Sequence, residues 1–215
     1  MGVEYIERKN EEIGSQECEP IYLPAASDCD AQVRLQFGDY SEKRQVIDGI
    51  FDPEIEKGTR DFFIYCNSLS GAFDFDSYMK EKSDESGCDI RIYTPLQVYR
   101  EIGRNYRCIG VMAANNLSAH AIEKALKTDN PDMYVVGSGN MAVVRAIEDG
   151  VPPKEIVENC ALGALAQYMQ ASGAEALLLG CTHFPYFAKE LSGVTDLTFI
   201  DPADMMFEAM INRPE

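Results

Sequence analysis

The sequence predicts an α/β protein made of two pseudo-symmetric lobes, each a doubly wound parallel sheet. Two observations favour this class. Short apolar runs alternate with segments of helical spacing along the 215 residues, which is typical of parallel sheets covered by helices. In addition, the apolar runs at residues 62–65 and 176–179 each end near a cysteine that a hydroxyl residue follows within two positions. This repeat predicts two similar lobes, each contributing one thiol to a cleft between them.

The strands are predicted from short apolar runs bounded by turn signals. The run at residues 176–179 is continuous, which indicates a strand buried on both faces, and Gly180 ends it. Polar, exposed loops are expected at residues 27–30 and 80–88. In chain order, the expected strands cover residues 20–25, 61–67, 90–94, 108–113, 133–136, 176–179 and 197–200.

The helices are predicted from apolar residues at helical spacing and from signals at their ends. Proline opens several of them, because its missing N–H costs nothing in a first turn. Gly58 and Gly150 end two others, and Pro53 is expected to interrupt one. In chain order, the expected helices cover residues 2–13, 41–57, 73–82, 95–104, 118–127, 141–149, 152–173, a short segment from Pro185, and 201–211.

Composition excludes several classes of partner. The net charge is −17 and no Lys/Arg cluster is present, which disfavours nucleic acid and anionic membranes as partners. No segment approaches the roughly 18 apolar residues of a membrane span, and the first ten residues are too polar for a signal peptide. The seven cysteines are an odd number without a spacing framework, which predicts reduced thiols and a cytoplasmic location.

Cys181, Thr182 and His183 follow a predicted strand end, where open α/β sheets bind their ligands. A free thiol has a pKa of about 8.5 and needs help to act as a base near neutral pH. A following helix N-terminus and the imidazole of His183 both favour thiolate. The remaining cysteines are interpreted as small buried hydrophobes: Cys18, Cys29, Cys88, Cys108 and Cys160.

Two motifs together carry a family resemblance. Residues 180–185, Gly-Cys-Thr-His-Phe-Pro, combined with the upstream Cys66-Asn67-Ser68, resemble the aspartate/glutamate racemase family. Residues 143–150 resemble the family segment that carries an acidic residue near the second cysteine, here Glu148. Residues 108–113 resemble its interdomain strand. The resemblance covers roughly residue 21 to the end and is sharpest at the cysteines.

The resemblance implies a pyridoxal-independent amino-acid racemase that needs no cofactor and no metal. One cysteine thiolate would remove the Cα proton of glutamate or aspartate, and the other, as a thiol, would deliver a proton from the opposite face. By family position these are Cys66 and Cys181. His183 and Glu148 would support the chemistry beside Cys181. The residues implied in substrate binding are Asn67, Ser68 and Thr182.

The sequence departs from the family pattern in three places. The family begins with a strand and a Gly-rich loop, whereas residues 1–10 predict a helix. We expect either that this loop is missing or that the start of the sequence was set too late. Ala114 and Leu117 stand where the family often has threonine, and Asn115 or Asn116 is expected to substitute, unless the pair forms a plain turn. Ser68 replaces the commoner threonine and keeps the hydroxyl.

The expected division places residues 1–94 and 186–215 in a first lobe with Cys66, and residues 95–185 in a second lobe with Cys181. The expected ligand is a small anionic amino acid or dicarboxylate, and a homodimer is a further expectation. Two alternatives stay open. One is a dicarboxylate isomerase, decarboxylase or hydantoin racemase on the same scaffold. The other is a racemase-like binding protein without catalysis.

Overall fold

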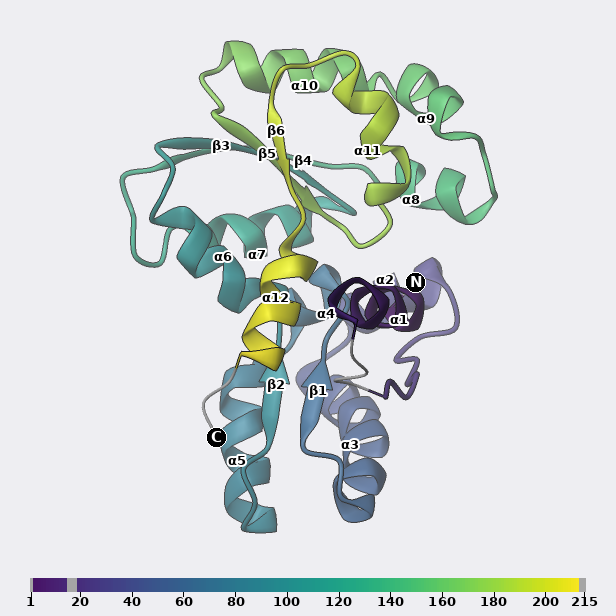
Figure 1. Cartoon of the computed structure of the whole chain (residues 1–215), viewed down its shortest axis with the longest axis vertical. Coiled ribbons are helices and arrows are strands. Elements are labelled where there is room, and N and C mark those ends of the chain that lie inside the picture. The colour runs from purple at the N-terminus through teal and green to yellow at the C-terminus, as the bar shows by residue number, and fades with distance from the viewer. Residues whose placement is uncertain (1, 15–18, 213–215) are drawn as a thin grey trace.

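The computed structural model describes residues 2–14 and 19–212, and Cys18 lies outside these ranges. Two parallel sheets form the centres of two lobes that lie one above the other (Figure 1). The smaller sheet has the order β1-β2 and the larger sheet the order β4-β3-β5-β6. All strand pairs are parallel. The predicted α/β class with two parallel-sheet lobes is therefore confirmed.

The smaller lobe is built from the first part of the chain. Its core is aromatic: the rings of Phe51 and Phe62 stack with centroids 4.2 Å apart, and Tyr78 packs edge-on against Phe51. These three side chains are almost completely buried. The elements of this lobe are α1 (Gly2–Ile13), α2 (Cys29–Phe37), α3 (Tyr40–Lys57), β1 (Asp61–Phe63), α4 (Asn67–Ala72), α5 (Phe75–Ser86) and β2 (Arg91–Tyr93).

The larger lobe buries both faces of its sheet. Every residue of β3 and of β5 is buried, as the continuous apolar runs predict. Leu177 and Leu179 of β5 pack towards α8–α11, whereas Leu178 packs towards α6 and α7. The elements are α6 (Pro95–Gly103), β3 (Cys108–Ala113), α7 (Asn116–Leu126), β4 (Tyr134–Gly139), α8 (Met141–Glu148), α9 (Pro153–Asn159), α10 (Leu162–Ala171), β5 (Ala176–Gly180), α11 (Pro185–Ser192) and β6 (Thr198–Ile200).

The last helix, α12 (Pro202–Ile211), returns to the smaller lobe. Phe207 and Met210 pack with Tyr5 and Ile6 of α1. This return comes later than the expected boundary at residue 186. Strand β6 pairs with β5, and Phe187 of α11 is buried in the core of the larger lobe. Residues 186–200 therefore belong with the larger sheet, because their apolar side chains cover it.

Several predicted elements need correction. Residues 20–25 form no strand, since Pro20 and Pro24 remove backbone donors. The expected loop at residues 27–30 contains the start of α2, where the Asp28 carboxylate accepts the N–H of Ala31 at 2.7 Å. The expected loop at residues 80–88 is mostly the last part of α5, and β4 continues to Gly139.

Two long helices also differ from expectation. Pro53 lies inside α3 without interrupting it. A capping box at Asp39 and Glu42 holds the start of α3, and the buried side chains of Ile47 and Phe51 hold its length. The expected helix over residues 152–173 is instead two helices, because Ala161 has a left-handed backbone with φ of 52°. The break lets α9 pack on α11 while α10 packs on β3.

No helix in the described ranges combines the length and apolar character that a membrane crossing requires. Within the same ranges, no group of three or more histidine, cysteine or acidic side chains is arranged to hold a metal ion.

Candidate active site

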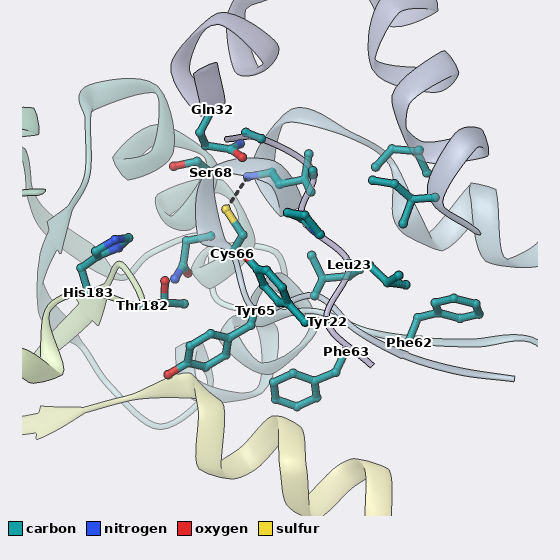
Figure 2. A pocket seen from close by; sticks show the side chains of 18 of the residues that line it. Tyr22, Leu23, Gln32, Phe62, Phe63, Tyr65, Cys66, Ser68, Thr182 and His183 are labelled. Atoms are coloured by element: carbon teal, nitrogen blue, oxygen red, sulfur yellow. Dashed lines mark hydrogen bonds between the residues drawn. The ribbon is translucent and has the colours of Figure 1, made fainter. Parts of the chain in front are cut away.

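Cys66 lies at the turn from β1 into α4. Its backbone is extended, and its Sγ caps α4 by accepting the N–H of Leu69 at 3.4 Å (Figure 2). The surrounding protein desolvates the thiol and raises its pKa, while the N–H groups of Leu69 and Ser68 favour the thiolate and oppose that rise. The local sequence thus places a thiol at a strand end with two donors directed at its sulfur.

Cys181 follows β5 in the larger lobe and begins a chain of three side chains. Its Sγ lies 3.6 Å from Nδ1 of His183. On the other side of the imidazole, Nε2 lies 3.4 Å from Oε1 of Glu148, which comes from the end of α8. Glu148, His183 and Cys181 are therefore connected in series, with the histidine in the middle.

The protonation states follow from burial. Desolvation raises the pKa of Cys181 to about 12, against the favourable N–H of His183, and electrostatic repulsion from Cys66 and Glu148 adds to the rise. Burial also lowers the pKa of His183, although Glu148 opposes this. At neutral pH the resting site therefore holds a Cys181 thiol beside a neutral imidazole. With its Nε2 proton directed at Glu148, the imidazole presents the Nδ1 lone pair to the thiol.

The amide oxygen of Asn67 has a hydrogen-bond partner, whereas its amide nitrogen has none. The hydroxyl of Tyr99, a fully buried side chain, donates to Oδ1 of Asn67. This bond orients the amide so that Nδ2 is the remaining donor, and Nδ2 is buried without a hydrogen-bond partner. Asn67 is only 3% exposed. A buried donor without an acceptor is costly, so this orientation indicates a place for a ligand oxygen.

Ser68 and Asn115 belong to a buried polar network that connects the two lobes. The hydroxyls of Ser68 and Ser118 lie 2.9 Å apart. Ser118 in turn accepts from Nε2 of Gln36 at 3.1 Å, and Nδ2 of Asn115 donates to Oε1 of Gln36 at 2.7 Å. The network ties α2 and α4 of the smaller lobe to α7 of the larger lobe.

A single cavity of about 720 Å³ brings most of the predicted residues together. Its volume is typical of small-molecule sites. It extends along residues 59–66 towards α3. Figure 2 shows Cys66 near its centre, with Thr182 and His183 on one side and Ser68 on another. The predicted site residues that line it are Cys66, Asn67, Ser68, Asn115, Glu148, Cys181, Thr182 and His183.

Asn116 is the one predicted residue that the structure places elsewhere. It is exposed, and its Oδ1 accepts the N–H of Gly139 at 3.2 Å. The reason is the geometry of α7. Asn115 is the N-cap of this helix, so Asn116 begins the first turn and faces β4 instead of the cavity.

Comparison of the sequence with models of known protein families gives a match. The model described as Asp/Glu/Hydantoin racemase matches residues 94–210, more than half of the chain. The chain belongs to the Asp/Glu/hydantoin racemase family. The match covers the larger lobe with Cys181, and extends through α12.

Members of this racemase family also match in sequence. The glutamate racemase of Corynebacterium glutamicum is 29% identical over 164 residues, which is 74% of this chain and 55% of that protein. The glutamate racemase of Limosilactobacillus reuteri is 31% identical over 102 residues, which is 46% of this chain and 38% of that protein. The matched segments thus span about two fifths to just over half of these relatives' length.

Solved racemase structures share the fold. The glutamate racemase of Francisella tularensis, solved in complex with D-glutamate, superposes with a TM-score of 0.65 at 20% identity, covering 96% of this chain and 78% of that chain. The aspartate racemase of Picrophilus torridus superposes with a TM-score of 0.61 at 13% identity, covering 97% of this chain and 88% of that chain. At these identities the likeness establishes the fold.

Sequence reasoning missed several residues of this racemase-family site. Cys29, interpreted as a buried hydrophobe, is half-buried and lines the cavity. Burial and the neighbouring Glu148 raise its pKa to about 11. Gln32 lines the cavity as well, and Gln36 belongs to the polar network. These three residues lie on α2. Because the sequence predicts a loop at residues 27–30, it does not predict that this helix brings them to the cavity. Cys108 is buried as expected, whereas Cys88 and Cys160 are half-buried and lie outside the cavity.

Proposed function

We propose that this protein is a pyridoxal-independent amino-acid racemase that interconverts the enantiomers of glutamate or aspartate. Cys66 and Cys181 act as the two bases. One observation carries the proposal: the two thiols come from different lobes and line the same cavity. A reaction that removes a proton from one face of Cα and returns one to the other face needs such a pair.

The proposed proton path on the larger lobe begins with His183. Nδ1 of His183 takes the proton of the Cys181 thiol, and the resulting imidazolium is stabilised by Glu148 on its other side. The Cys181 thiolate then removes the Cα proton of the substrate. Because burial raises the pKa of this thiol to about 12, its thiolate is a strong base once formed. A strong base suits a weak carbon acid such as Cα.

The smaller lobe completes the reaction in the proposal. The Cys66 thiol donates its proton to the opposite face of Cα and becomes a thiolate, which the N–H of Leu69 stabilises at 3.4 Å. In the reverse direction the two cysteines exchange roles. The unpaired Nδ2 of Asn67 binds an oxygen of the α-carboxylate, and the hydroxyls of Ser68 and Thr182 assist. These neutral donors stabilise the negative charge that develops on the carboxylate in the transition state.

The ligand in this proposal is a small amino acid. The related Francisella protein was solved with D-glutamate bound, and the sequence relatives are glutamate racemases. The choice between glutamate and aspartate is part of the proposal, since an aspartate racemase also shares the fold, with a TM-score of 0.61. A cytoplasmic location and a homodimer stay predictions.

Variants of single cysteines test this function. Cys66→Ser and Cys181→Ser should each reduce racemisation of glutamate and aspartate, followed by circular dichroism, by at least about a thousandfold, because each removes a reacting group. Cys88→Ala and Cys160→Ala are matched controls, because both thiols lie outside the cavity. Full activity in either cavity variant, or an equal loss in the controls, would contradict the proposal.

One observation keeps the alternative on the same scaffold open. The cavity continues along residues 59–66 beyond the two thiols, and its volume of about 720 Å³ accommodates ligands larger than a free amino acid. A panel of hydantoins and dicarboxylates in the same assay separates this alternative from amino-acid racemisation. Binding of glutamate without turnover of any member of the panel would favour a non-catalytic binding protein.

A further inference from the structure

The cavity contains a second buried amide nitrogen without a partner. Nε2 of Gln32 on α2 is shielded from solvent and has no hydrogen-bond partner, and the same is true of Nδ2 of Asn67. Both residues line the cavity that holds the two thiols. Buried polar atoms are almost always paired in folded proteins, so two unpaired donors in one cavity indicate two positions for acceptor atoms of a ligand.

The position of Gln32 is fixed by its own helix. Gln36 lies one turn later on α2 and therefore on the same face. Nε2 of Gln36 donates to Ser118 at 3.1 Å, and the Ser118 hydroxyl lies 2.9 Å from that of Ser68. This network holds the α2 face that carries Gln32 against the first turn of α4. Figure 2 shows Gln32 on the side of the cavity that also carries Ser68 and the sulfur of Cys66.

The donors available to an anion at this end of the cavity are uncharged. Among the described residues that line the cavity, Arg60 is the only arginine and no lysine is present. The Arg60 guanidinium lies at the start of β1 and donates to the carbonyls of Ile55 and Thr59, each at 2.9 Å. A carboxylate near the thiols is therefore bound by amide and hydroxyl groups. A primary amide supplies two N–H donors on one nitrogen, and either can donate to a carboxylate oxygen.

We propose that Gln32 binds the carboxylate at the end of the ligand's side chain, while Asn67 binds the α-carboxylate. The cavity is then a two-point site for a dicarboxylic acid, with the two anchors on α2 and α4 of the smaller lobe. The assignment of the α-carboxylate to Asn67 rests on the proposed racemase function. The assignment of a second carboxylate to Gln32 rests on its unpaired nitrogen, its place in the cavity lining and its position on α2, which the Gln36–Ser118–Ser68 network holds against α4.

The test uses two simple probes, glutarate with two carboxylates and butyrate with one. Neither has an amino group, so their binding does not depend on racemisation. Dissociation constants come from NMR titration of the full chain. Wild-type protein should bind glutarate at least about tenfold more tightly than butyrate, because a hydrogen bond to a charged acceptor changes affinity by about one to two orders of magnitude.

Substitution of Gln32 should remove this preference. Gln32→Leu should bind glutarate about 10- to 100-fold more weakly and butyrate unchanged, whereas Gln32→Glu should bind glutarate more weakly than butyrate through like-charge repulsion. Gln45→Leu is the matched control, since Gln45 is exposed on α3 and lies outside the cavity. Thermal melting of each variant checks folding.

Three results would overturn the assignment: equal binding of the two probes by wild-type protein, a retained preference in Gln32→Leu, or an equal loss for both probes in that variant. The proposed function fails separately. A protein that loses the glutarate preference on Gln32→Leu but racemises no amino acid would keep the two-carboxylate site and lose the racemase assignment.

Discussion

The contact between Glu148 and His183 gives a direct test of how the site produces a thiolate. Glu148→Gln keeps the size and shape of the side chain and removes its charge. Oε1 of Glu148 lies 3.4 Å from Nε2 of His183, and the opposite ring nitrogen lies 3.6 Å from Sγ of Cys181. The glutamine oxygen can still accept the Nε2 proton, so the imidazole keeps its tautomer. What the variant loses is the negative charge that stabilises the imidazolium formed when Cys181 gives up its proton.

The size of this loss follows from the geometry. Two unit charges separated by 3.4 Å attract by about 5 kcal/mol at an effective dielectric constant of about 20. The side chains of Glu148 and His183 are 34% and 20% exposed, so solvent weakens the attraction. A net value of about 1.5–3 kcal/mol, typical of a hydrogen bond between charged groups, is appropriate. Glu148→Gln should therefore lower kcat/KM by about 10- to 150-fold.

The fall in kcat/KM is measured by circular dichroism in reactions that start from each enantiomer of glutamate or aspartate. Because the two enantiomers have equal free energy, kcat/KM must fall by the same factor in both directions. Glu155→Gln is the matched control, since Glu155 is exposed on α9 and lies outside the cavity. Unchanged activity in Glu148→Gln, or an equal loss in the control, would refute the role given to this carboxylate.

Two further predictions follow from buried groups. Tyr99→Phe leaves Oδ1 of Asn67 without its donor. This should lower the free energy of unfolding, measured by urea denaturation, by about 1–3 kcal/mol, and raise the KM of racemisation. Unchanged values of both would contradict the role given to the Tyr99–Asn67 hydrogen bond. The second concerns Cys181, whose pKa is raised from 9.0 to about 12. Between these values the unfolded chain releases a proton that the folded chain keeps, so stability falls as pH rises, by about 1.4 kcal/mol per pH unit from this thiol. Cys181→Ala should show a shallower decline between pH 9 and 11, and identical slopes would contradict this interpretation.

Local sequence was sufficient to predict the parts of the site that lie at strand ends. The continuous apolar run before Cys181 predicts a strand that is buried on both faces. The thiol of Cys181 therefore lies at the carboxyl end of that strand, where parallel sheets bind their ligands. The same reasoning predicted Cys66 after the apolar run at residues 62–65, although β1 itself ends at Phe63 and Cys66 is the N-cap of α4. In both cases a few neighbouring residues determine the backbone and therefore the position of the sulfur.

The rest of the site depends on contacts between distant segments, which local patterns do not reveal. Gln32 and Gln36 enter the site because α2 packs on α4. The polar residues around Asp28 were interpreted as a loop, although the Asp28 side chain is the N-cap of that helix. The lobe boundary was placed too early for a similar reason. Whether residues 186–200 cover one sheet or the other is decided by packing, since their spacing is compatible with both.

The most direct test of two opposed bases is the isotope content of the product. The reaction is run in D₂O with L-glutamate or L-aspartate that carries ordinary hydrogen at Cα. The isotope at Cα of each enantiomer is followed by NMR after chiral separation. Removal by one cysteine thiolate and delivery by the other cysteine, as a deuterated thiol, should give a D-product that carries deuterium from the first turnovers, while the remaining L-substrate keeps its proton. A D-product that retains the original proton, or no deuterium at Cα of either enantiomer, would contradict the account.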